Sequence, residues 1–236
     1  MIATESSAPA SKPVWSTTFR RFSAGRFTIV GPIGVSVHDW SRPRQGQPRL
    51  FDQDLLEWFT CAHPAFILAF YVPASLAFLW LGHQAGVAAL AMLGWWAIGL
   101  FCWSFLEYAI HRFSFHMTPR VRPQVIVGYL MHGVHHSHPD DSRRWVMPLV
   151  VTVPIAALIY LSLRALAGAN ASPMFAGVLH GYMVYDSLHF AIHRGPVPTR
   201  LGAYLRAYHF QHHYGVPERQ FGVSSPLWDW IFRTTR

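Results

Sequence analysis

Two uncharged apolar runs, separated by only two residues, constrain this chain more than any other feature of its sequence. Residues 64–82 (PAFILAFYVPASLAFLWLG) and 85–105 (AGVAALAMLGWWAIGLFCWSF) contain no charged side chain. About 20 apolar residues are enough to span the hydrocarbon core of a bilayer. We therefore expect two consecutive transmembrane helices, at about 64–82 and 85–106, because the core of a soluble protein rarely provides two such runs in succession.

Two further apolar runs complete the pattern. Residues 147–168 carry one charge, Arg164, which lies close enough to the end of the run to reach the membrane surface. Residues 173–186 form a shorter run that contains His180. Hydrophobic residues make up 52% of the chain and charged residues only 13%, about half the charged share of a soluble domain. We expect an all-α integral membrane protein in which four transmembrane helices form two hairpins.

The basic residues predict the orientation of these spans. All except Arg164 lie before the first run, between the second and third, or after the fourth, and the short connections His83–Gln84 and 169–172 carry no charge. Loops rich in Lys and Arg stay in the cytoplasm. We therefore expect both ends and a helical cap, residues 107–146 and 187–236, on the cytoplasmic side. The bias of Arg over Lys favours a bacterial plasma membrane, with the ER membrane expected in a eukaryote.

The N-terminal segment differs from the rest of the chain. Residues 1–60 are polar and rich in Pro and Arg, so we expect them to be loosely ordered, and residues 61–236 to form the membrane domain. No basic start precedes an apolar stretch here, and we expect no cleavable signal peptide. In so apolar a chain the net charge of +8 suits anionic lipid headgroups, and we expect no nucleic-acid partner. Two cysteines, Cys61 and Cys102, are too few for a disulfide scaffold.

Ten of the fifteen histidines form four clusters, HRFSFH, HGVHH, HFAIH and HFQHH. Their members are His111, His116, His132, His135, His136, His189, His193, His209, His212 and His213. Histidines at positions i, i+3 and i+4 share one face of a helix. The first two are five residues apart, so one of them must lie at a bend or bind a different ion. All four clusters lie near membrane ends on the expected cytoplasmic side, where one fold can bring them together.

Ten imidazoles are too many for one metal ion and suit two. Imidazole binds Fe, Zn, Cu and Ni. A structural zinc site would favour cysteine, which no cluster contains, and bis-histidine haem ligation would leave most of the clusters without a role. We expect the isolated His38, His63, His83 and His180 to be ordinary structural residues, and a ligand role is not favoured for His138. The clustered histidines therefore predict a dimetal site.

The clusters and their flanking residues resemble the fatty acid hydroxylase and sterol desaturase superfamily, and most closely its fatty acid 2-hydroxylases. The similarity lies in WSFLEYAIHRFSFHM (103–117), LMHGVHHSHPDDSRRWVMP (130–148), GYMVYDSLHFAIHRG (181–195), YHFQHHYG (208–215) and FGVSSPLWDWIF (221–232). The resemblance implies that the ten histidines bind two iron ions, which zinc can replace. It also implies an O₂-dependent monooxygenase that hydroxylates carbon 2 of a lipid acyl chain, with no catalytic residue beyond the metal ligands.

The chain departs from the eukaryotic members, which often carry a fused cytochrome domain. Its N-terminal segment is too short for that domain and lacks the HPGG haem motif, so we expect a separate electron donor of the cytochrome or ferredoxin type. A sterol or carotenoid oxidase, a lipid-headgroup hydroxylase or a desaturase of the same superfamily remains an alternative. A membrane metal-binding or transport protein is the alternative of another class. It would need ionisable residues in the middle of the spans, where only His180 lies.

Four charged residues beside the clusters are candidates for orienting the metal ligands. Neutral imidazoles leave the charge of a metal ion uncompensated, and carboxylates around the ligands tune such sites. Glu107 precedes the first cluster by four residues and Asp186 the third by three, although both could equally be polar residues at the end of a span. Asp141 and Arg144 could orient the second cluster or meet a polar headgroup.

Overall fold

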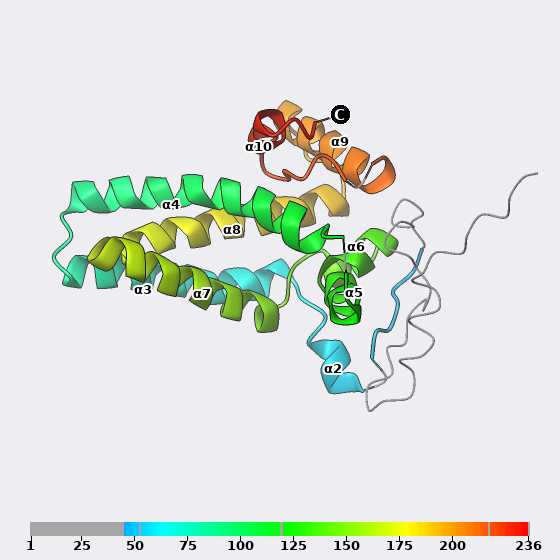
Figure 1. Cartoon of the computed structure of the whole chain (residues 1–236), viewed down its shortest axis with the longest axis horizontal. Coiled ribbons are helices and arrows are strands. Elements are labelled where there is room, and N and C mark those ends of the chain that lie inside the picture. Colours follow the sequence, from blue (N-terminus) through cyan, green and yellow to red (C-terminus); the bar gives the residue numbers. More distant parts are fainter. Residues whose placement is uncertain (1–44, 52, 119, 217, 236) are drawn as a thin grey trace, which may run out of the picture.

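The computed structural model describes residues 45–51, 53–118, 120–216 and 218–235, and this part of the chain is mostly helical (Figure 1). Its α-helices are α2 (Asp54–Trp58), α3 (Pro64–Gln84), α4 (Ala89–Ile110), α5 (Arg122–Gly128), α6 (Val134–Ser137), α7 (Leu149–Ala167), α8 (Ala171–Arg194), α9 (Arg200–Tyr214) and α10 (Leu227–Ile231). Shorter turns connect or extend them: π-helical at His111–Phe115 and Tyr129–Gly133, and 3-10 at Ser142–Arg144 and Gly168–Asn170.

Four long helices, α3, α4, α7 and α8, lie side by side in an elongated bundle (Figure 1). The shorter helices gather at one end of this bundle, where α4 and α8 both end. We call this region, residues 111–146 and 195–235, the cap. The fold therefore places the chain segments that carry the four histidine clusters at the same end of the bundle.

Within the bundle, α8 packs against α3, α4 and α7. Glycines let α8 approach α4 closely. A Cβ atom on Gly177 of α8 would lie 2.0 Å from the carbonyl oxygen of Trp96, and one on Gly99 of α4 would lie 1.8 Å from that of Met174. Small residues at helix interfaces are typical of helices that associate in a membrane.

The helices occupy the expected regions but differ at their ends. The second begins at Ala89 rather than at residue 85, because the preceding residues turn the chain and Gly86 adopts a φ of +76°, in the left-handed region. The fourth is a 24-residue helix that continues through HFAIH to Arg194. Likewise α4 continues to Ile110. Glu107 and the third histidine cluster therefore lie on the long helices rather than in a separate cap, and Asp186 lies on α8 within the region expected for the fourth span.

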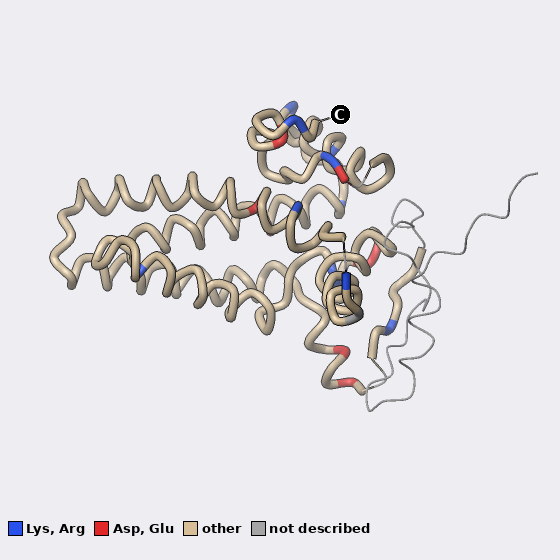
Figure 2. The backbone as a smooth tube through the Cα atoms, in the orientation of Figure 1, with Lys and Arg blue, Asp and Glu red and all other residues tan. Residues whose placement is uncertain are grey.

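By length and apolarity, three stretches of the described chain are able to cross a membrane: Pro64–Gln84, Ala89–Phe115 and Ser142–Arg194. The third contains α7 and α8, joined by a 3-10 turn. Large apolar side chains on these helices are exposed, among them Leu90 (82%) and Leu166 (85%). Figure 2 shows that charged residues gather around the cap rather than along the bundle. So extensive an apolar exterior is typical of a protein surrounded by lipid.

The first described residues pack against the cap. Leu50 is fully buried in a cluster with Tyr129 and Val134. Leu50, within the segment expected to be loosely ordered, is therefore packed against the cap. Residues 1–44, which include His38, lie outside the described part of the chain.

Candidate metal centre

The structure brings all ten clustered histidines together in two groups of five. The first group consists of His111, His116, His132, His136 and His212, and the second of His135, His189, His193, His209 and His213. Within each group, one ring nitrogen from every histidine lies within 4.8 Å of the others. The two groups adjoin, since the ring centroids of His136 and His213 are 4.2 Å apart.

A π-helical turn brings the first cluster into a single group. The residues from His111 to Phe115 are π-helical, and the backbone N–H of His116 donates to the carbonyl oxygen of His111 at 3.0 Å. Because a π-helix pairs each residue with the fifth one after it, residues five apart come close together. The five-residue spacing therefore marks a local change in helix type, and both histidines belong to the same group.

Each HxxHH motif contributes to both groups. Its first and last histidines join one group, and its middle histidine joins the other: His135 in the second cluster and His212 in the fourth. The middle ring is turned by about 100° from the ring that follows it, because each residue of an α-helix advances by that angle. The structure here differs from the simpler expectation that all three rings share one face. His135 and His212 each lie in the group opposite to that of the other two histidines in their motif. We call this the exchange of His135 and His212, and it means that each helical segment contributes ligands to both groups.

The facing ring nitrogens are close enough to share an ion. In the first group, Nε2 of His132 lies 2.9 Å from Nε2 of His111 and of His136. In the second group, Nε2 of His209 lies 2.9 Å from Nε2 of His193. Two nitrogens bound at about 2.1 Å and at right angles on one ion would be about 3 Å apart. These separations fit a cation held between the rings.

Backbone carbonyls hold three of the rings from behind. Because a carbonyl oxygen only accepts, each ring donates from Nδ1 and keeps the lone pair of Nε2 directed into its group. The pairs are His111 with Phe221 (2.5 Å), His189 with Trp145 (2.6 Å) and His212 with Arg219 (2.6 Å). Such partners fix both the tautomer and the orientation of a metal ligand.

Burial keeps the histidines of the cap neutral. It lowers the pKa of His212 to about 4, and burial together with the charges of neighbouring histidines lowers the pKa of His135 and His209 well below the usual value. At neutral pH these rings therefore offer lone pairs rather than positive charge. Both ring nitrogens of His135 are buried without a hydrogen-bond partner within the described residues. A bound metal ion would satisfy this otherwise unpaired imidazole.

Glu107 is connected to the histidines through the backbone that follows α9. Its Oε1 accepts hydrogen bonds from the N–H groups of Val223 (2.7 Å) and Ser224 (2.8 Å), and the hydroxyl of Ser224 donates to Oε2. These bonds fix the segment whose Phe221 carbonyl holds His111. The candidate role of Glu107 in orienting a ligand is thus compatible with the structure, although the carboxylate contacts the backbone that follows Phe221 rather than the His111 ring itself.

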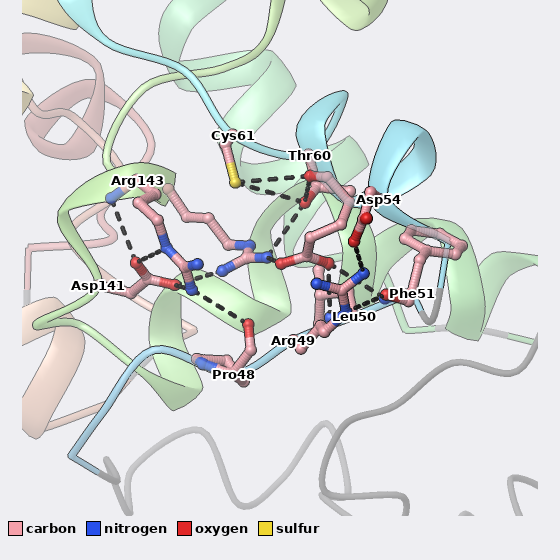
Figure 3. A network of polar contacts seen from close by, with 11 residues as sticks. Pro48, Arg49, Leu50, Phe51, Asp54, Thr60, Cys61, Asp141 and Arg143 are labelled. Atoms are coloured by element: carbon pink, nitrogen blue, oxygen red, sulfur yellow. Dashed lines mark hydrogen bonds and ion pairs between the residues drawn. The ribbon is translucent and has the colours of Figure 1, made fainter.

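Arg144 pairs with Asp141 and with a carboxylate from the N-terminal segment, Glu57. Figure 3 shows the polar network around Asp141. The Arg144 guanidinium donates to Asp141 and, at 2.6 Å, to Oε1 of Glu57. Glu57 Oε2 in turn accepts from the N–H groups of Leu50 (2.8 Å) and Phe51 (3.1 Å). The side chains of Arg144 and Asp141 are buried. This network connects the N-terminal segment to the loop that follows the second cluster.

Glu57 has no counterpart among the residues singled out from the sequence. It lies 87 residues before Arg144. Two residues so far apart in the sequence form no local motif that could be recognised, and the residues beside Glu57 belong to no histidine motif. The backbone carbonyls behind His111, His189 and His212 leave no sequence signal for the same reason, since every residue has a carbonyl group.

A largely apolar cavity begins at the histidines. It is partly open to the surroundings. His132, His135 and His189 line it at one end, and its walls continue along α4, α7 and α8. Asp186 also lines it and accepts a long hydrogen bond, of 3.5 Å, from the hydroxyl of Tyr182. An apolar chain inside this cavity would reach both histidine groups.

The isolated histidines of the described chain occupy structural positions. His63 Nδ1 accepts a hydrogen bond from the first turn of α3. His180 accepts a hydrogen bond from the indole N–H of Trp96 at 2.7 Å and so joins α8 to α4. His83 is exposed at the end of α3, and His138 is buried but belongs to neither group.

Comparison with known proteins gives a consistent answer. The family model for fatty acid hydroxylases matches residues 96–234. The fatty acid 2-hydroxylase of Rattus norvegicus is 32% identical over 230 residues, which cover 87% of this chain and 61% of that protein. A dihydroceramide fatty acyl 2-hydroxylase of Arabidopsis thaliana is 31% identical over 210 residues, 87% of this chain and 88% of that protein.

A solved structure is also similar. It is described as full-length scs7p with only the hydroxylase domain visible, and it superposes with a TM-score of 0.79 at 32% sequence identity, covering 84% of this chain and 76% of that chain. The chain spans 61% of the length of the rat protein, so the further parts of that protein have no counterpart in the similarity. The similarity includes all four histidine clusters, because residues 96–234 contain them.

Proposed function

The chain belongs to the fatty acid hydroxylase family, and from this we propose that it is a membrane-bound dimetal oxygenase that hydroxylates a lipid acyl chain at carbon 2. The names of two relatives, fatty acid 2-hydroxylase and dihydroceramide fatty acyl 2-hydroxylase, support both the acyl chain and the position. Carbon 2 is the carbon beside the carbonyl group, and its C–H bond is one that acid–base side chains alone do not oxidise.

The observation that carries this proposal is the meeting of the two histidine groups with an apolar cavity. His135 and His189 of the second group and His132 of the first all line it. A metal-binding or transport protein has no need of an apolar pocket at its ligands, whereas an enzyme that oxidises an acyl chain requires one. The cavity walls would bury the chain and keep water away from the reacting carbon.

The ten histidines would hold two iron ions, five to each ion. Iron bound there would supply the activation of O₂, a reaction that lies outside the chemistry of protein side chains. Zinc can occupy the same ligands, because imidazole sites bind Zn²⁺ more tightly than Fe²⁺. The carbonyl oxygens of Phe221, Trp145 and Arg219 would keep the rings in one tautomer and orientation through the reaction.

The position of the cavity favours the carboxyl end of the substrate. Its histidine end lies beside the cap, and its other end lies inside the apolar bundle. A lipid that entered from the membrane would keep its polar group near the cap and its hydrocarbon tail in the bundle. The carbon beside the carbonyl would then be the first methylene to reach the histidines.

The topology belongs to the same proposal. Helices α3, α4, α7 and α8 would cross the membrane as two hairpins, with the cap and both ends in the cytoplasm and the protein in a bacterial plasma membrane. The concentration of charged residues at the cap supports this orientation (Figure 2). A separate cytochrome or ferredoxin would then donate electrons from the cytoplasm.

A sterol or carotenoid oxidase, a headgroup hydroxylase and a desaturase use related chemistry, and product analysis separates them from the proposed activity. The chain should be expressed with an electron donor in a host that lacks 2-hydroxylated lipids. Mass spectrometry is expected to find 2-hydroxy acyl chains. An oxidised sterol or headgroup as the sole product would contradict the substrate, and lipids identical to those of the empty host would contradict the oxygenase.

A further inference from the structure

The cavity follows one face of α8 from the histidines into the bundle. Its lining residues on α8 include Phe175, Leu179, Tyr182 and Asp186 and end at His189, a spacing that keeps them on one side of the helix. Phe175 and His189 are fourteen residues apart, which corresponds to about 21 Å along an α-helix. The lining residues on α7, from Thr152 to Ile159, also share one face of their helix but cover about half that length.

At the end of the cavity that lies farthest from the histidines, Phe175 forms part of the wall, and two further aromatic rings pack against it from outside the cavity. Phe78 of α3, Tyr160 of α7 and Phe175 of α8 meet there, and we call them the aromatic stop. The ring centroids of Phe78 lie 4.7 Å from those of Phe175 and 4.6 Å from those of Tyr160, and Tyr160 and Phe175 are 5.2 Å apart. Phe175 is buried and lines the cavity.

The aromatic stop is rigid because each ring comes from a different helix. Moving any one of them requires a movement of its helix or of the two other rings, and well-packed aromatic clusters resist both. Tyr160 is held further by its hydroxyl group, which lies 3.4 Å from Oγ of Ser172 on α8. An acyl chain that reached these rings would meet a fixed wall rather than a flexible side chain.

We propose that the aromatic stop sets the maximum length of the acyl chain, with Phe175 as the residue that contacts its methyl end. This inference rests on the proposed function, which places carbon 2 at the histidines. A fully extended carbon chain advances about 1.3 Å per bond, so about 21 Å accommodates about 16 bonds beyond carbon 2, which is an acyl chain of about 18 carbons. Discrimination should be steep, because a single methylene in an apolar pocket changes selectivity by about 10- to 200-fold.

Two substitutions with opposite effects test the proposal. Phe175→Ala removes the ring at the stop and should extend the longest accepted chain by about 3 to 4 carbons, the length of the missing ring. Ile159→Phe adds a ring to the cavity wall on α7 and should shorten the longest accepted chain. Phe66→Ala is the matched control, because Phe66 is on α3 and 65% exposed on the outside of the bundle.

The measurement is the chain-length distribution of 2-hydroxy products, obtained by mass spectrometry from cells fed a series of saturated fatty acids that brackets the expected limit. Equal limits in the wild type, Phe175→Ala and Ile159→Phe would overturn the inference and leave the proposed function intact. A wild type that makes no hydroxylated acyl chain would overturn the proposed function and the inference together. If Phe175→Ala fails to insert, an unchanged limit in Ile159→Phe alone would overturn the inference.

Discussion

The loss of one imidazole, that of His135, should disrupt metal binding by the second histidine group. His135 comes from the second cluster but lies in the second group, where both of its ring nitrogens are buried and unpaired within the described residues. Replacing His135 with Ala should lower hydroxylation severely. The loss should exceed the factor of about 10 to 100 that is typical when a residue supporting a metal ligand is replaced. His83→Ala should be close to neutral, since His83 is exposed at the far end of the bundle. Product by mass spectrometry and expression level check both; near-normal product from His135→Ala would count against the site.

Arg144 is the other residue whose loss should be severe. It neutralises two buried carboxylates, Glu57 and Asp141, and removing one partner of a buried ion pair costs about 3–5 kcal/mol. Arg144→Met should lower the thermal stability of the protein in detergent by a corresponding amount. Arg143→Met is the control: its side chain is 36% exposed, it forms an ion pair with one carboxylate, Asp141, and it donates to the carbonyl oxygen of Pro48 at 3.3 Å, so the loss should be much smaller. Equal losses in the two variants would contradict the network drawn in Figure 3.

The ion pair between Glu57 and Arg144 predicts that the stability of the fold depends on pH. Burial alone would raise the pKa of Glu57, but the N–H groups of Leu50 and Phe51 and the Arg144 guanidinium outweigh it and lower the pKa. A carboxyl group with a lowered pKa stabilises the fold above its unfolded pKa of about 4.3, and the effect is lost as the pH falls through the folded value. The difference in stability between the wild type and Arg144→Met should therefore shrink below about pH 4. A difference that stays constant or grows there would contradict this account.

At the scale of helices, the close approach of α4 and α8 positions the first and third clusters relative to each other. Gly177→Ala would place a methyl group 2.0 Å from the carbonyl oxygen of Trp96 and force the two helices apart. Overpacking of this kind costs about 1–3 kcal/mol or more. Gly94→Ala on α4 is the control, because a Cβ there meets no atom within 4 Å. The unfolding temperature and the metal content should both fall for Gly177→Ala and stay unchanged for Gly94→Ala. Equal values in the two variants would contradict the role of the close helix contact.

The positions of the long helices follow from the sequence because each is a long apolar run, but their ends do not. Apolarity stops near the membrane surface, whereas α8 continues through the third histidine cluster and a π-helical turn extends α4 into the first. The ten histidines could be singled out because their spacing is local. Their division between two groups could not, since it depends on a π-helical turn and on the exchange of His135 and His212, which tertiary contacts determine.

For the whole molecule, the orientation in the membrane is the open prediction. Single cysteines at Gln84 and Asp140, both exposed, should be introduced after Cys61 and Cys102 have been replaced. A membrane-impermeant thiol reagent added to intact cells should label position 84 and leave position 140 unlabelled until the membrane is opened. The charge distribution requires this result, because basic loops stay in the cytoplasm. Labelling of position 140 in intact cells would reverse the proposed topology.

The number of metal ions in each chain tests the central claim most directly. Protein purified in detergent after growth with added iron should contain close to two ions per chain, by elemental analysis against the protein concentration from amino-acid analysis. Two groups of five histidines, with nitrogens within 4.8 Å of one another in each, predict that number. Iron, zinc or a mixture of both would satisfy it, because imidazole accepts either metal. A ratio that saturates at one ion per chain would contradict the dimetal centre.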